Sequence, residues 1–171
     1  LLSAPPMTLT VAGTNGKGSV VSVLSAALIY SGKRVGRYTS PHLNRFNERI
    51  CIDDVEVEDT DLVAAFEAIT EATGAVSLTY FEVATLAAIW IFRERDVDVQ
   101  VLEVGLGGRL DAVNIIDADL SVVTSIGLDH TDWLGDSREL IAIEKAGVAR
   151  AGRPCVVADP DPPGSLLSTL D

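Results

Sequence analysis

The chain has 171 residues, of which 47% are hydrophobic, and it carries a formal net charge of −12. This length and apolar content fit one globular domain and argue against disorder. The negative charge disfavours binding to nucleic acid or to an anionic membrane surface. No apolar run of about 18 residues is present, so we expect no membrane span. Cys51 and Cys155 lie far apart without metal-type spacing, which is typical of reduced thiols in a cytoplasmic protein.

The first predicted element is a short buried strand over residues 9–12, which leads into the glycine-rich run from Val11 to Ser19. A helix is predicted from Gly18 to Ser31. The amides of a glycine-rich turn can converge on an anion because no Cβ blocks the approach. The positive end of the helix dipole points at the same place, and Lys17 adds a full charge. We therefore predict a phosphate site.

This run departs from the general phosphate-loop pattern G-x-x-x-x-G-K-[ST] at two positions. Val11 stands where the pattern has its first glycine, and Gly18 stands where it has a hydroxyl residue. A tight strand-to-helix turn with a surface lysine is therefore the alternative interpretation of this run taken alone.

Strands and helices alternate along the rest of the chain. Strands are predicted over residues 34–38, 97–104, 120–125 and 155–158, with a hairpin over 49–57 that turns at Asp53-Asp54. Helices are predicted over about 60–72 (capped by Asp59 or Thr60), 81–93 and 137–149, and residues 159–164 look like a connection. This order predicts an α/β fold of P-loop NTPase-like type, a mostly parallel sheet with helices on both faces.

Ligands of such sheets bind beyond the carboxyl ends of the strands. The phosphate loop, Ser40, Glu103 and His130 each follow a predicted strand, so we expect them to meet at one edge. Glu103 ends an apolar strand, where a carboxylate is tolerated with a cation such as Mg²⁺ beside it. The alternative is an ordinary exposed glutamate. His130, between two aspartates, and Ser40 are candidate metal ligands, with bland loop roles as alternatives.

Other residues have two interpretations each. Lys145 lies on a mostly apolar helix segment, where a snorkelling surface lysine is the ordinary role. Asp111 could orient a substrate or cap a turn. Arg109 could pair with an anionic group of a substrate. Glu82, at the start of a predicted buried helix, could cap that helix or serve as a polar group in a pocket.

Together these segments resemble the ATP-binding domain of the folylpolyglutamate synthase and dihydrofolate synthase family, of the bacterial bifunctional type within the Mur ligase superfamily. The matching segments run in family order over about residues 8–158. They are Gly13-Thr-Asn-Gly-Lys-Gly-Ser19, Ser40-Pro-His-Leu43, Arg49, Tyr80-Phe-Glu82, Glu103-Val-Gly-Leu-Gly-Gly-Arg-Leu-Asp111, Asn114, Thr124-Ser-Ile-Gly-Leu-Asp-His130 and Glu144-Lys-Ala-Gly147.

The resemblance implies a role for each matching position. The ATP phosphates are assigned to Thr14, Asn15, Gly16, Lys17, Gly18 and Ser19, and Mg²⁺, as two ions, to Ser40, Glu103 and His130. The pterin part of dihydropteroate is assigned to Thr79, Tyr80, Phe81, Glu82, Leu110, Asp111 and Ala112. Lys17, Lys145 and Asp111 are assigned to catalysis, with Lys145 carbamylated.

The implied reaction is ATP-dependent amide formation, in which an acid substrate forms an acyl phosphate that the amine of glutamate then attacks. It would add glutamate to dihydropteroate, to folates or to both, with small molecules as the partners and a monomer when full length. Family members are more than twice this length. We therefore expect residues 1–171 to be an ATP-binding domain incomplete at both ends, without the C-terminal domain and inactive alone. The alternatives are a non-catalytic nucleotide-binding module, a cell-wall Mur-type amide ligase, and a kinase.

Overall fold

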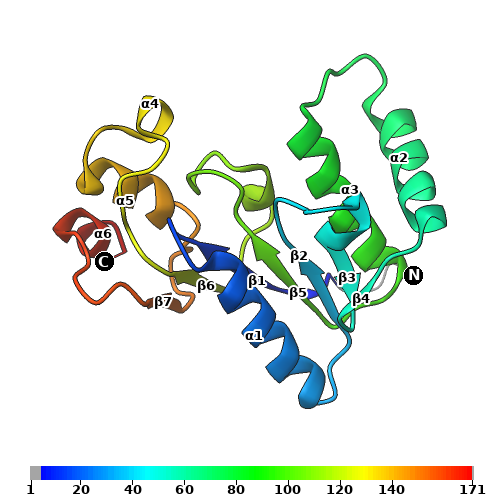
Figure 1. The fold of residues 1–171 in the computed structure, drawn as a ribbon, viewed down its shortest axis with the longest axis horizontal. Coiled ribbons are helices and arrows are strands. Elements are labelled where there is room, and N and C mark those ends of the chain that lie inside the picture. The colour runs from blue at the N-terminus through cyan, green and yellow to red at the C-terminus, as the bar shows by residue number, and fades with distance from the viewer. Residues whose placement is uncertain (1–4, 171) are drawn as a thin grey trace.

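The computed structural model describes residues 5–170, so residues 1–4 and 171 of the predicted domain lie outside the described residues. Strands and helices alternate along the chain, and the predicted α/β fold is confirmed (Figure 1). The strands are β1 (Met7–Ala12), β2 (Val35–Tyr38), β3 (Ile50–Ile52), β4 (Val55–Glu56), β5 (Val99–Glu103), β6 (Leu120–Val123) and β7 (Cys155–Val157). The helices are α1 (Lys17–Tyr30), α2 (Asp59–Thr73), α3 (Tyr80–Glu94), α4 (Thr131–Leu134), α5 (Arg138–Ala146) and α6 (Gly164–Leu170), with 3-10 turns η1 (Phe46–Arg49) and η2 (Ala112–Ile115).

The strands form one sheet in the order β4-β3-β2-β5-β1-β6-β7. Strands β2, β5, β1, β6 and β7 are parallel, while β3 and β4 form the predicted antiparallel hairpin at one edge. Both hairpin turn residues, Asp53 and Asp54, have a positive φ, as a two-residue turn requires. The parallel order brings the carboxyl ends of β1, β2, β5 and β6 to one edge of the sheet, the edge that runs across the strand ends and not along the hairpin.

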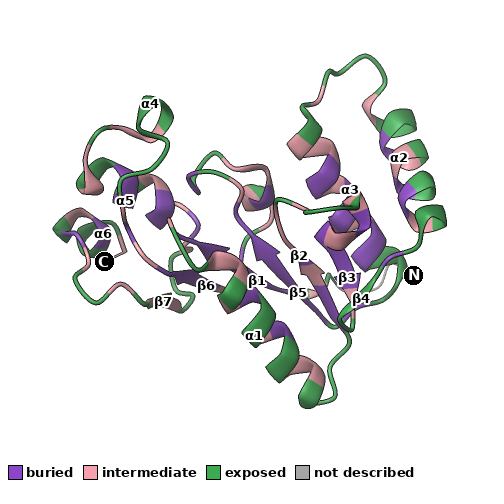
Figure 2. Cartoon of the chain, in the orientation of Figure 1, coloured by how far each residue is buried: buried purple, intermediate pink, exposed green. Residues whose placement is uncertain are grey.

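Alternate residues of the central strands pack against different helices. Leu9, Val11 and Val101 belong to a core cluster with α1, which lies in front of the sheet in Figure 1. Ala12 and Leu102 face the other side, where α2 and α3 cover the sheet. The central strands are almost entirely buried, as Figure 2 shows, so their polar residues Thr8, Thr10 and Gln100 are buried together with the apolar ones.

The remaining part of the same face carries α5 and α6, which pack with Val123 of β6. Helices α4 and α6 were not predicted; α6 begins at Gly164, where the predicted connection ends. The predicted cap of α2 was also wrong. The N-cap is Glu58, because the carboxylate of Asp61 accepts the Glu58 amide. Within residues 5–170, the helices lack the length and apolar character needed to span a membrane.

Candidate phosphate and substrate site

The loop after β1 is shaped by two glycines with a positive φ. Gly13 has φ 145°, and a Cβ there would lie 1.8 Å from the hydroxyl oxygen of Thr124. Gly16 has φ 84° and forms the N-cap of α1. The amides of the first turn of α1 have no acceptor within the helix, and they point out of its N-terminus. The loop therefore presents free donors and a helix dipole to one point, as an anion site needs.

This loop is bonded tightly to the loop after β6. The Thr14 amide donates to the Ser125 carbonyl at 2.7 Å, and the Thr14 hydroxyl both donates to and accepts from the backbone of Gly127. The Thr124 hydroxyl donates to the Asn15 carbonyl at 2.7 Å, and the Asn15 amide donates to the Ser125 hydroxyl at 3.2 Å. The amides of Thr14 and Asn15 are thus already used, so an anion would meet those of the first helical turn.

Two lysines converge on one carbonyl oxygen of this loop. Lys17 Nζ and Lys145 Nζ each donate to the Gly13 carbonyl at 3.1 Å. Lys145 is only 4% exposed, so its interpretation as a snorkelling surface lysine is wrong. Burial, and secondly the charge of Lys17, lowers the pKa of Lys145 to about 8. The two ammonium groups share this carbonyl acceptor, and the carboxylates whose charges act on them are those of Glu103, Asp111 and Asp129.

Glu103 at the end of β5 is buried, with 5% of its surface exposed, so its interpretation as an ordinary exposed glutamate is wrong. Its carboxylate accepts the Ser40 amide at 3.1 Å. A Cβ on Gly18 would lie 3.7 Å from the same carboxylate, which therefore sits against the first turn of α1. Burial raises the pKa of Glu103, although the Ser40 amide and the charge of Lys17 oppose this rise. The structure thus brings Ser40, Glu103 and the phosphate loop together.

His130 follows β6, as predicted, but its surroundings are more open. It is the N-cap of α4 in the left-handed conformation, with φ 47°. Its side chain is 54% exposed and its Nε2 lies 3.7 Å from the Asp129 carboxylate. Within the described part of the chain, no group of three His, Cys, Asp or Glu side chains is placed to hold a metal ion. No hydrogen bond within residues 5–170 joins the His130 side chain to Ser40 or Glu103.

Two adjoining cavities of about 350 and 370 Å³ lie beside this edge, between the start of α3 and the loop after β5. Six of the seven predicted substrate residues line them, namely Thr79, Phe81, Glu82, Leu110, Asp111 and Ala112. Tyr80 does not line either cavity, and its ring packs against Phe46 instead.

Both predicted roles of Glu82 are present, because it lines the cavities and its carboxylate also accepts the Thr79 amide at 2.6 Å. Asp111 is likewise a turn cap: its carboxylate accepts the amides of Leu106 and Val113. Burial raises the pKa of Asp111, although those amides oppose the rise. The cavity wall is therefore built from carboxylates that also hold the local backbone.

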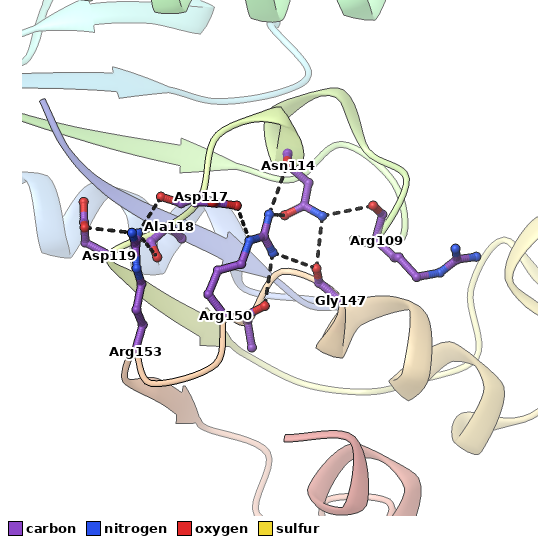
Figure 3. A network of polar contacts seen from close by, with 9 residues as sticks. Arg109, Asn114, Asp117, Ala118, Asp119, Gly147, Arg150 and Arg153 are labelled. Carbon is purple, nitrogen blue, oxygen red and sulfur yellow. Dashed lines mark hydrogen bonds and ion pairs between the residues drawn. The ribbon is translucent and has the colours of Figure 1, made fainter. Parts of the chain in front are cut away.

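The loop after β5 is fastened to the end of α5 by a polar network (Figure 3). The side-chain amide nitrogen of Asn114 donates to the carbonyls of Arg109 and Gly147. The guanidinium of Arg150 donates to the backbone carbonyl and the side-chain oxygen of Asn114. Arg109 itself pairs with Glu144 at 2.8 Å. This network fixes the cavity residues relative to Lys145, which lies on α5.

One residue of this edge had no predicted role. Arg49, 7% exposed, donates from Nε to Nδ1 of His42 at 2.8 Å. Its guanidinium lies 5.8 Å from the centre of the Phe46 ring and 5.5 Å from that of Tyr80. The sequence places Arg49 at the start of the predicted hairpin, and its contact with Tyr80 depends on how α3 packs, which the sequence does not show.

The fold and its glycine loop define a P-loop NTPase-like α/β domain. No family model matches the chain. It is 51% identical over 166 residues to the dihydrofolate synthase/folylpolyglutamate synthase of Escherichia coli K12, covering 97% of this chain and 39% of that protein.

Two solved structures are similar. E. coli FolC in complex with DHPP and ADP superposes with a TM-score of 0.95 at 50% identity, covering 98% of this chain and 41% of that one. A bifunctional folylpolyglutamate synthase/dihydrofolate synthase with Mn, AMPPNP and L-glutamate bound gives 0.93 at 51% identity, with the same coverage. The chain belongs to the dihydrofolate synthase/folylpolyglutamate synthase family, and it spans about two fifths of the length of these relatives.

Proposed function

We propose that residues 1–171 form the ATP-binding part of an ATP- and Mg²⁺-dependent ligase that adds glutamate to dihydropteroate, to folates or to both. The observation that carries this proposal is the convergence of Lys17 and Lys145 on the Gly13 carbonyl, beside the buried carboxylate of Glu103. Two relatives support it, since one solved structure holds ADP and DHPP and another holds Mn, AMPPNP and L-glutamate.

The phosphates of ATP would bind at the first turn of α1. The amides of Lys17, Gly18 and Ser19 face the anion, while Thr14, Asn15 and Gly16 give the loop its shape. Lys17 would exchange its two carbonyl partners, Gly13 and Thr14, for oxygens of the outer phosphates. Its positive charge lowers the repulsion between ATP and an incoming carboxylate.

The residues around Glu103 fit a hard divalent cation. A buried carboxylate with a single amide partner is costly unless a cation joins it, and oxygen is the preferred ligand of Mg²⁺. Glu103, Ser40 and His130 would hold two ions, with phosphate oxygens and water completing the coordination. Mg²⁺, when bound, supplies charge neutralisation at the transferred phosphoryl group.

Lys145 would carry a carbamate. Because its pKa is about 8, a substantial part of its amine is neutral near that pH, and the neutral amine is the form that attacks CO₂. The N–C bond forms, the amine loses a proton, and a buried cation becomes an anion.

In the reaction, the pterin part of the substrate would occupy the two cavities lined by Phe81, Glu82 and Asp111. The substrate carboxylate attacks the γ-phosphate of ATP, which gives an acyl phosphate and ADP. The amine of glutamate then attacks the acyl carbon, and phosphate leaves. The protein positions the reactants and neutralises charge, and it needs no nucleophile of its own. Relatives are longer, so we expect residues outside 1–171 to be required for turnover.

Glu103→Gln in the full-length protein tests this proposal. Loss of the carboxylate should reduce the Mg²⁺-dependent part of ADP affinity by roughly 10- to 100-fold, as measured by calorimetry with and without Mg²⁺. Without metal the variant should unfold at higher urea than the wild type at pH 7, because a buried carboxylate with a raised pKa is replaced by a neutral amide. Glu94→Gln, an exposed charge change on α3, is the matched control.

Unchanged Mg²⁺ dependence in Glu103→Gln would contradict the assignment. Phosphate release separates the alternatives. A ligase releases phosphate only when both the acid substrate and glutamate are present. A kinase transfers phosphate without glutamate, and a non-catalytic module binds ADP but turns nothing over.

A further inference from the structure

Arg49 is a buried cation without an anionic partner. It is 7% exposed, yet no carboxylate within residues 5–170 pairs with its guanidinium. Its Nε is bound to His42, and its plane lies near the rings of Phe46 and Tyr80. These contacts fix the direction of the guanidinium but leave its charge unbalanced, which is costly for a buried group.

The carboxylate of Glu48, the residue before Arg49 in the sequence, is already bound to backbone amides. Glu48 accepts the amides of Leu43, Asn44 and Arg45. Arg109, which the sequence offered as the partner of an anionic substrate group, is itself paired with Glu144. Of Arg49 and Arg109, Arg49 is the one that pairs with no carboxylate of residues 5–170.

Arg49 also lies between two parts of the proposed site, the segment around Ser40 and the first cavity. Its carbonyl accepts the Thr39 amide at 2.9 Å, which places its backbone one residue from Ser40, where Glu103 is bound. On its other side, the charge of Arg49 acts on the hydroxyl of Tyr38, which accepts a hydrogen bond from Thr85 at 3.3 Å. Thr85 lines the first cavity. The Arg49 segment is therefore connected on one side to Ser40 and on the other, through Tyr38 and Thr85, to the wall of the first cavity.

We propose that Arg49 binds the carboxylate of the acid substrate and directs it from the cavity towards the phosphate loop. This inference rests on the proposed ligase function. A guanidinium presents donors in a plane that matches a carboxylate, and aromatic rings beside it keep that plane fixed. His42 is a positioning residue, because it accepts the Nε hydrogen of Arg49. The guanidinium also lies beside the Tyr38 hydroxyl, so a bound carboxylate would share its donors with that hydroxyl.

The test compares an acid ligand with its neutral analogue in the full-length protein. Dihydropteroate and its carboxamide, which lacks the negative charge, are titrated into the wild type, Arg49→Gln and Arg49→Lys with ADP and Mg²⁺ present. We expect Arg49→Gln to weaken dihydropteroate by roughly 10- to 100-fold and the carboxamide by less than about threefold. Arg49→Lys should recover only part of the affinity, since an ammonium cannot bind a carboxylate in the same plane.

Arg45→Gln is the matched control, because Arg45 is exposed near the same turn and pairs with Asp59. It should leave both affinities unchanged. His42→Ala should raise the KM for dihydropteroate more than it lowers kcat. If His42 had a merely structural role, the variant would instead lower the thermal stability without this larger change in KM. Equal weakening of the acid and the carboxamide in Arg49→Gln, with ADP affinity kept, would overturn the role of Arg49 and leave the ligase proposal standing. If the wild type binds neither dihydropteroate nor a reduced folate in the same titration, the ligase proposal itself fails.

Discussion

Two loops meet at the same edge of the sheet but are held in opposite ways. The phosphate loop (residues 13–16) is bonded to residues 124–127, which are about 110 positions away in the sequence. In the loop after β2 (residues 39–45), Ser40 is bound to the distant Glu103, but residues 43–45 are held by Glu48, whose carboxylate accepts three amides from three to five positions away. The first loop therefore depends on the whole sheet, and residues 43–45 of the second depend mainly on their own segment.

This difference predicts how far the structural effect of a substitution extends. A change in the phosphate loop must disturb β6 and the loop after it, because the two loops share their hydrogen bonds. A change at Glu48 should loosen a few residues and leave the core as it is.

Gly13→Ala should have the largest effect on stability. The new Cβ would lie 1.8 Å from the Thr124 hydroxyl, so either the loop or β6 must move. We expect the free energy of unfolding to fall by about 2–4 kcal/mol, and ADP binding to be lost with it. Urea unfolding followed by fluorescence, together with calorimetry for ADP, measures both.

Gly16→Ala is the control for Gly13→Ala. Gly16 also has a positive φ, but a Cβ there meets no atom within 4 Å. Its cost should therefore be the backbone strain alone, about 1 kcal/mol. Equal destabilisation by the two variants would show that the contact with Thr124 does not matter, and the dependence on the distant loop would be refuted.

Lys145→Met should have the next largest effect, with the opposite sign. The pKa of Lys145 is about 8 in the folded chain and 10.5 in its ordinary state, so the unfolded chain binds more protons between these values. Wild-type stability should therefore rise as the pH increases from about 8 to about 10.5. Well below pH 8 the buried amine is protonated, and at about pH 6 Lys145→Met should raise the free energy of unfolding by roughly 2–3 kcal/mol.

Urea unfolding at several pH values, in buffer depleted of CO₂, measures this effect. Lys33→Met is the control, since Lys33 is exposed and its removal should leave the pH dependence unchanged. If Lys145→Met keeps the wild-type rise above pH 8, the buried lysine is not its source.

The sequence predicted much of this edge because the signals are local. Glycines before a helix, a carboxylate at the end of an apolar strand and the alternation of strands and helices each depend on a few neighbouring residues, and they located the phosphate loop and Glu103. The hairpin at Asp53-Asp54 was found for the same reason.

What the sequence did not predict depends on distant partners. Burial of Lys145 arises from its bond to Gly13, 132 positions away, and a helix segment alone cannot distinguish a buried lysine from an exposed one. Arg49 contacts His42 and Phe46 of its own segment and Tyr80 of α3, and the contact with Tyr80 depends on how α3 packs, which no local spacing pattern shows. The exposure of His130 follows from the left-handed start of α4, a helix of four residues that is too short for a periodic signal.

Glu48→Gln should have the smallest and most local effect. Its pKa is lowered chiefly by the amides of Leu43, Arg45 and Asn44, so the carboxylate form holds this loop above the ordinary pKa of glutamate and releases it as the pH falls through the lowered value. A neutral amide keeps the shape but weakens the three bonds. We expect faster hydrogen exchange at residues 43–45 with the urea midpoint unchanged, measured by NMR at pH 6. A shift of the midpoint comparable to that of Gly13→Ala would mean that the loop after β2 also depends on the sheet, and the contrast between the two loops would be lost.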